Sequence, residues 1–152
     1  MAAFQATCHE RLQHSIPPDN TRPLRVCSQD ERRLGVLTVR RRRLTARGVQ
    51  PVGLVQHTFE WFYVYGAVAP ATGERFWLEL PYLNADTFQI VVDAFAHAFP
   101  DSCNSLLLDN SGVHTAQRLR WPANVQPVWL PPYCPELNPI ARVWRDVKDE
   151  LA

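Results

Sequence analysis

The sequence predicts an α/β fold in which a mixed sheet is flanked by helices. Its 152 residues, 46% of them hydrophobic, suffice for one hydrophobic core and are few for two domains. Apolar residues alternate as in strands before residue 81, recur at helical spacing after it, and then form two further strand-like runs. The predicted order is strand, hairpin, helix, strand, strand, helix, which is typical of helices packed on a mixed sheet.

The first half of the chain is expected to supply an arm, a strand and a hairpin. Residues 1–20 are polar and end in IPPDN, which favours a turn, so we interpret them as an N-terminal arm or linker ahead of a domain over residues 21–152. The stretch PLRVCSQDE alternates as a short strand that ends on Asp30 and Glu31. Residues 54–80 contain two β-rich runs separated by PATG, which predict a hairpin.

The second half is expected to contain two helices and two strands. Asn84 can cap a helix through ADTFQIVVDAFAHAF, whose apolar face comprises Phe88, Val91, Val92, Phe95 and Phe99. The apolar run in SCNSLLLDN is typical of a fully buried strand and ends on Asp109. A short helix through TAQRLRW and a strand through VQPVWL follow, and Pro139 fits the first turn of a final helix over roughly residues 138–151.

The ends of two predicted strands carry aspartates, Asp30 and Asp109. With a third acid on a packed helix, two such aspartates would form a scaffold for Mg²⁺, which takes oxygen ligands in octahedral geometry. Two ions held in this way can activate a water or a 3′-hydroxyl in phosphodiester transfer. An aspartate at a strand end is also a common turn-forming or helix-capping residue, so spacing alone leaves both interpretations open.

The stretch LLLDNSGVH and the later WLPPYCPELNPIARVWRDVK closely resemble the catalytic core of DDE transposases from bacterial insertion sequences of the mariner superfamily. SQDERRLGV and GERFWLEL also resemble that family's first strand and sheet, and the resemblance covers roughly residues 23–151. It implies a ribonuclease H-like fold and an enzyme that uses Mg²⁺ or Mn²⁺ to cleave and transfer DNA strands. On the same resemblance, Asp30 and Asp109 are the first two catalytic acids and the metal ligands.

Further positions match residues that flank the family's catalytic acids. We expect these residues to shape the site rather than to react: Asn110, His114, Tyr133, Pro135, Asn138 and Pro139. For His114 a structural hydrogen-bonding role is an equal alternative to positioning a phosphate or water.

The third acid of the resemblance is a glutamate directly after N-P-I, and this chain has Ala141 there. Glu136 and Asp146 are poor substitutes, because Glu136 lies in a proline-bounded loop and five residues along a helix rotate Asp146 by about 140° from position 141. Asn138 is close enough to offer a carbonyl oxygen but brings no charge. We therefore expect strand transfer to be weak or absent. The alternatives are a non-catalytic DNA-binding or regulatory remnant, and a ribonuclease H-like nuclease unrelated to transposition.

Basic residues are concentrated in one segment although the formal net charge is only +1. Seven of the 16 basic residues lie between residues 32 and 47, namely Arg32, Arg33, Arg40, Arg41, Arg42, Arg43 and Arg47. Such a run, from Arg40 to Arg43 with Arg47, can neutralise DNA phosphates in a salt-dependent, sequence-independent way. The alternative is a solvated strand or loop. The aromatic hairpin around Trp61 and Tyr65 could likewise stack on bases, although core packing explains it better.

The sequence shows neither a signal peptide nor an apolar stretch of eighteen residues, and its four cysteines form no C-x-x-C pair. We therefore expect a cytoplasmic, nucleoid-associated bacterial protein that does not contact a membrane. The resemblance implies DNA as the partner, both transposon ends and target, and a homodimer on that DNA. Twenty residues cannot hold a helix-turn-helix region, so a separate polypeptide would supply end recognition or the chain is a fragment.

Overall fold

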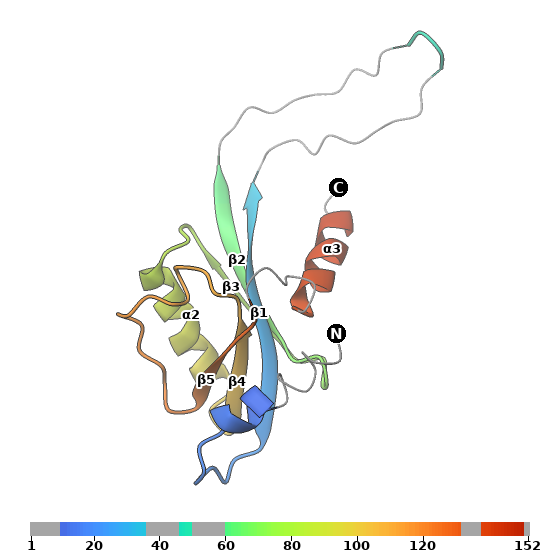
Figure 1. Cartoon of the computed structure of the whole chain (residues 1–152). Helices are drawn as coiled ribbons and strands as arrows, with labels where there is room; N and C mark the ends of the chain where they lie inside the picture. Colours follow the sequence, from blue (N-terminus) through green and yellow to red (C-terminus); the bar gives the residue numbers. More distant parts are fainter. Residues whose placement is uncertain (1–9, 36–45, 50–59, 132–137, 151–152) are drawn as a thin grey trace.

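The computed structural model describes residues 10–35, 46–49, 60–131 and 138–150. They form a five-stranded sheet in the order β3-β2-β1-β4-β5 with two long helices (Figure 1). The elements along the chain are β1 (Leu24–Gly35), β2 (Trp61–Val68), β3 (Arg75–Leu80), α2 (Ala85–Ala98), β4 (Cys103–Leu108), β5 (Val125–Trp129) and α3 (Ile140–Glu150). This order confirms the predicted α/β class and the succession of strands and helices.

The sheet is mixed because β1 pairs antiparallel with β2 but parallel with β4, which in turn pairs parallel with β5. The parallel pairing of β1 ends at Ser28↔Leu107, whereas its pairing with β2 continues to Gly35↔Trp61. The prediction of a short strand that ends on Asp30 and Glu31 is therefore wrong in its length, because β1 continues to Gly35. Asp30 lies in the middle of β1, two residues beyond the end of the pairing with β4.

The two helices cover opposite faces of the sheet, α2 on one and α3 on the other (Figure 1). The main core lies beneath α2, where Phe88 and Phe95 pack with Cys27 of β1. A smaller cluster on the opposite face contains Leu107 with Val26 packed against it. Neighbouring residues of β1 thus point to opposite faces, as alternation in the sequence predicts.

Helix α2 begins as predicted. The Asn84 side chain accepts hydrogen bonds from the backbone N–H groups of Asp86 and Thr87, and Thr87 Oγ1 accepts one from the Asn84 N–H at 3.1 Å. This reciprocal capping box satisfies donors that the first helical turn leaves unpaired. The helix ends at Ala98, just ahead of Pro100.

The expected helix through TAQRLRW is wrong, because residues 115–121 form turns and irregular backbone. The segment has isolated bonds such as Leu119 N–H to Ala116 O at 3.1 Å. A helix this short is not stable by itself, and the Trp121 ring is instead packed edge-on against Phe88 and Trp129. Tertiary contacts with the core therefore override the local helical preference.

Part of the expected N-terminal arm contacts the sheet. Residues 10–15 are helical, and Leu12 packs on the smaller apolar cluster. The Arg11 guanidinium donates to Trp129 O at 2.9 Å. Within the described residues, no helix is long and apolar enough to span a membrane.

Candidate active site

The site lies where the parallel pair β1 and β4 ends. Ser28 pairs with Leu107, and Asp30 and Asp109 each follow two residues later in their own chain segment. Strands that run parallel present the same ends at one edge of the sheet, so the two aspartates are brought to one level. Their carboxylates interact, since the charge of Asp109 contributes to the raised pKa of Asp30.

Asp30 is a partly buried acid held by an indole. Trp144 of α3 donates its Nε1–H to Asp30 Oδ2 at 3.1 Å. Burial, as the largest cause, and the negative charges of Glu31 and Asp109 raise the pKa of Asp30 from 3.8 to about 6. Hydrogen bonds from Trp144 and the Glu31 backbone oppose this rise. Asp30 is therefore an acid whose ionised form is disfavoured by burial and by two neighbouring acids.

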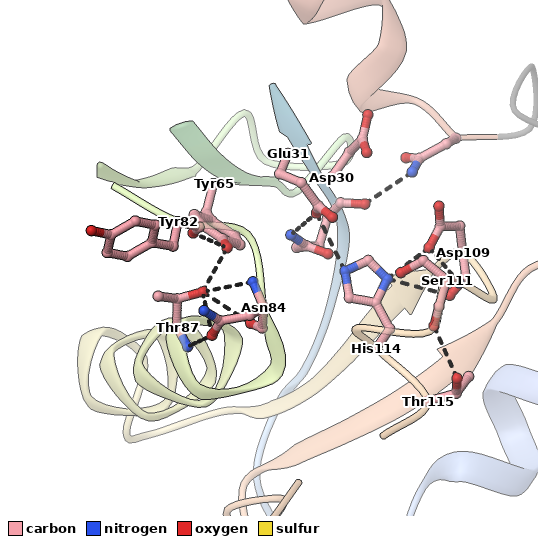
Figure 2. Close-up of polar contacts among 12 residues, drawn as sticks. Asp30, Glu31, Tyr65, Tyr82, Asn84, Thr87, Asp109, Ser111, His114 and Thr115 are labelled. Atoms are coloured by element: carbon pink, nitrogen blue, oxygen red, sulfur yellow. Dashed lines mark hydrogen bonds and ion pairs between the residues drawn. The ribbon is translucent and has the colours of Figure 1, made fainter. Parts of the chain in front are cut away.

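Asp109 is oriented by a histidine that also contacts Glu31 (Figure 2). His114 Nδ1 lies 2.7 Å from Asp109 Oδ1, which also accepts from the Ser111 N–H at 3.0 Å. On its other side, His114 Nε2 lies 3.3 Å from Glu31 Oε2, an ion-pair distance without a hydrogen bond. The ring is 1% exposed and packs on Phe88 of α2 with centroids 4.4 Å apart.

The carboxylates set the charge of this histidine. Burial by itself would lower the pKa of His114, but Glu31 and Asp109 outweigh it and the pKa is raised. Burial would raise the pKa of Asp109, yet the Ser111 N–H and His114 lower it below its usual range. An ionised Asp109 and a protonated His114 therefore stabilise each other.

The start of α3 is fastened to β1 beside the acids. Asn138 donates its Nδ2–H to Gln29 O at 2.9 Å, and its Oδ1 accepts from the Ser28 hydroxyl and, at 3.4 Å, from the Ile140 N–H. The side-chain oxygen suggested by the sequence as a neutral ligand is therefore already engaged in capping and anchoring. Ala141, in the first turn of α3, is exposed.

The structure places some of the remaining predicted residues. Asn110 donates its Nδ2–H to Leu130 O at 2.6 Å, which ties the segment after β4 to the end of β5. Arg47 is exposed. The predictions for Arg40, Arg41, Arg42, Arg43, Tyr133 and Pro135, and the comparison with Glu136, lie outside the described residues.

The aromatic hairpin divides between the core and the surface. Tyr65 is fully buried and its hydroxyl lies 3.0 Å from Thr87 Oγ1 and donates to Tyr82 O at 2.9 Å (Figure 2). Trp61, by contrast, is 48% exposed, and the Arg33 guanidinium lies 5.7 Å from its ring centroid. Core packing therefore explains Tyr65, as expected, whereas the ring of Trp61 remains accessible.

Two interactions at the site were not foreseen from the sequence, namely the bond from Trp144 to Asp30 and the contact of Glu31 with His114. The spacing of Trp144, three residues beyond Ala141, could have indicated that both lie on neighbouring positions of one helix. For Glu31 no sequence signal distinguishes a buried acid from a solvated one. Within the described residues, no three His, Cys, Asp or Glu side chains converge as a metal site.

The fold of this chain, a mixed sheet with helices on both faces, is ribonuclease H-like, and solved structures share it. A solved Mos1 transposase paired-end complex with left transposon end superposes with a TM-score of 0.66 at 17% identity, over 97% of this chain and 47% of that one. A pre-cleavage Mos1 transpososome superposes with a TM-score of 0.66 at 16% identity, over 97% of this chain and 48% of that one. A Mos1 mariner paired end complex with Mn superposes with a TM-score of 0.65 at 17% identity, over 97% of this chain and 47% of that one. The chain therefore spans about half the length of these proteins.

The family follows from the sequence itself. The model of the DDE superfamily endonuclease family matches residues 25–152, and the chain belongs to this family. A curated relative, the uncharacterized protein y4pE/y4sA of Sinorhizobium fredii, is 36% identical over 90 residues, which cover 59% of this chain and 67% of the relative.

Proposed function

We propose that this chain is the catalytic domain of a DDE transposase, which binds DNA and acts on its phosphodiester bonds with a divalent cation held by Asp30 and Asp109. The observation that carries the proposal is the meeting of these two acids at the end of the β1/β4 pair, beside the start of α3. Family membership and the ribonuclease H-like fold support the same chemistry.

The donor set fits Mg²⁺ or Mn²⁺. Carboxylate oxygens are the ligands that hard divalent cations prefer. The pKa of Asp30 is raised first by burial and then by the charges of Glu31 and Asp109, and a bound cation would stabilise the ionised acid. When bound, such an ion would polarise the scissile phosphate and acidify the attacking hydroxyl. His114 and Ser111 would hold Asp109 in place, and Asn138 would fix the start of α3 against β1.

Ala141 occupies the position that we assign to the third acid, and we infer that this impairs catalysis. One pair of unit charges 4 Å apart contributes about 4 kcal/mol at an effective dielectric of 20. A loss of about 4 kcal/mol in the transition state corresponds to about a thousandfold in rate. Asp146 does not replace the missing acid in our proposal, because it is exposed and lies five residues further along α3.

Restoring the acid tests this proposal. Ala141→Glu should increase Mg²⁺-dependent nicking of plasmid DNA by up to about a thousandfold, whereas Ala141→Gln, of equal length but neutral, should not. Nicking should be lost again in Ala141→Glu combined with Asp30→Asn or Asp109→Asn. If Ala141→Glu stayed at background with both aspartates intact, the assignment of position 141 would be wrong; if the parent chain nicked equally well, its impairment would be disproved.

A second candidate function is a DNA-binding or regulatory protein without catalysis. It is favoured by the lack of three convergent metal-ligating side chains in the described part of the chain. Salt-sensitive DNA binding without nicking by either the parent or Ala141→Glu would support it.

For the leading function we further propose a homodimer on DNA, a separate helix-turn-helix polypeptide, and residence in the bacterial nucleoid. Nicking that needs no terminal inverted repeats would instead indicate a nuclease unrelated to transposition.

A further inference from the structure

Asp30 belongs to a row of residues that crosses three strands. Asp30 pairs with Gly66 of β2, and Gly66 pairs with Trp77 of β3. Residues directly opposite each other in a sheet point to the same face, so the row lies on one face. That face is the one covered by α3, since Trp144 of this helix contacts both ends of the row.

Trp144 spans the row from above. Its indole N–H reaches Asp30 Oδ2 at 3.1 Å, and its ring packs against Trp77 with centroids 5.3 Å apart and an interplanar angle of 63°. The glycine between them makes room, because a Cβ on Gly66 would lie 2.8 Å from Trp77 Cε3 and 2.9 Å from Ile140 Cδ1. The row thus combines an acid, a glycine and an aromatic support that together accommodate one indole.

The N–H of this indole has a specific partner. Trp144 is 5% exposed, so its ring could serve packing alone, and a phenyl ring would fill much of the same space. Instead the N–H is aimed at a partly buried acid, and among the described residues it is the side-chain donor to Asp30. A buried indole N–H needs an acceptor, and here the acceptor is the proposed metal ligand itself.

This contact also links position 141 to Asp30. Asn138 fastens the start of α3 to Ser28 and Gln29, and Trp144 fastens its second turn to Asp30. Ala141 lies between these two attachments. The first turn of α3 is therefore held at a fixed place relative to the first acid.

We propose that Trp144 is a positioning residue for cation binding, which fixes one oxygen of the Asp30 carboxylate and aligns α3 with it. The inference rests on the proposed function, because it requires that Asp30 binds a divalent cation. Groups that hydrogen-bond to metal ligands without touching the metal orient those ligands, and their loss weakens metal affinity by about 10- to 100-fold.

The test measures binding of Mn²⁺ alone to the full chain, by calorimetry and by the loss of free Mn²⁺ signal in electron paramagnetic resonance. Trp144→Phe keeps a ring against Trp77 but removes the N–H, and it should weaken binding by about tenfold. Trp77→Phe is the matched control, since it changes the other ring of the same pair and keeps the N–H of Trp144, and it should weaken Mn²⁺ binding less than Trp144→Phe does. Thermal unfolding of each variant separates lost packing from lost orientation.

The outcomes distinguish this inference from the proposed function. If Asp30→Asn abolishes Mn²⁺ binding while Trp144→Phe binds like the parent, the role of Trp144 is overturned and the metal site stands. If neither the parent nor Ala141→Glu binds Mn²⁺ at the site, both the role of Trp144 and the proposed function are overturned. Should Trp144→Phe fail to fold, 3-benzothienylalanine at position 144, which replaces the N–H by sulfur at nearly constant shape, should show the same weakening.

Discussion

Asp30 carries an ionisable side chain in a place that disfavours its charge. Burial and the neighbouring acids Glu31 and Asp109 all raise its pKa, to about 6. A carboxyl group that only capped a turn would gain nothing from such surroundings. Strongly shifted acids that share one location are typical of functional sites, because a bound cation can then stabilise them.

The pH dependence of the unfolding free energy should reveal the cost of ionising Asp30 in the folded chain. The pKa of Asp30 is higher in the folded chain, about 6, than the ordinary 3.8, so the folded state binds its proton more tightly. Stability contributed by the protonated acid is therefore present below pH 4 and lost as the pH rises through 6. Without divalent metal, Asp30→Asn should raise the unfolding free energy by about 1–3 kcal/mol at pH 7.5 and have little effect at pH 4.

Urea unfolding with a chelator at both pH values checks this prediction. Asp101→Asn, which changes an exposed acid outside the site, is the control and should show no such difference between the two pH values. An equal effect of Asp30→Asn at pH 4 and pH 7.5 would contradict the proposed cause.

At the scale of elements, the change of partners along β1 creates the site. Residues 24–28 of β1 pair with β4 and residues 28–35 pair with β2, so the strand changes its partner at Ser28. The segment after β4 carries Asp109 and His114 and lies beside this part of β1, where His114 contacts Glu31. Helix α3 contacts the same region from one face through Trp144, so a helix and the end of the β1/β4 pairing meet at Asp30.

The packing of α3 should depend on Gly66. A Cβ there would lie 2.8 Å from Trp77 Cε3 and 2.9 Å from Ile140 Cδ1, so Gly66→Ala should displace α3. We expect an unfolding free energy lower by about 1–3 kcal/mol, the usual cost of overpacking. The control is Gly112→Ala, because a Cβ at Gly112 meets nothing within 4 Å. Chemical unfolding compares the two variants, and equal effects would show that the row is not tightly packed.

At the scale of the whole molecule, the fold of this chain matches part of a longer solved chain. It spans 47% of the Mos1 chain whose paired-end complex it resembles in fold. Its formal net charge of +1 gives little general attraction to DNA, so the arginines between residues 32 and 47 would have to supply the phosphate contacts.

A salt titration of DNA binding tests this role. Reversing Arg41 and Arg43 to glutamate should weaken binding and reduce the slope of log affinity against log salt by about two. Arg22→Glu, placed just before β1 and far along the strand from Asp30, should change the slope less. An unchanged slope in the double variant would exclude a phosphate role for the run.

Much of the fold could be predicted from local patterns. The helix cap at Asn84 and the buried strand at residues 103–108 were each predicted from residues within one segment, and both predictions are confirmed. The helix expected at residues 115–121 failed because the segment is too short to be stable alone and Trp121 packs on the core. The length of β1 was underestimated because its continuation depends on β2, a partner distant in the sequence.

The sequence by itself determined the class of fold, the two aspartates and the alanine that follows N-P-I, because these depend on residue identity and short-range periodicity. Only the tertiary structure decided which side chains hold those acids: the indole of Trp144 on Asp30, and His114 between Asp109 and Glu31. The physical reason is that a hydrogen bond between distant residues depends on how helices pack on the sheet. Burial likewise sets the charge of an acid, and no local pattern records it.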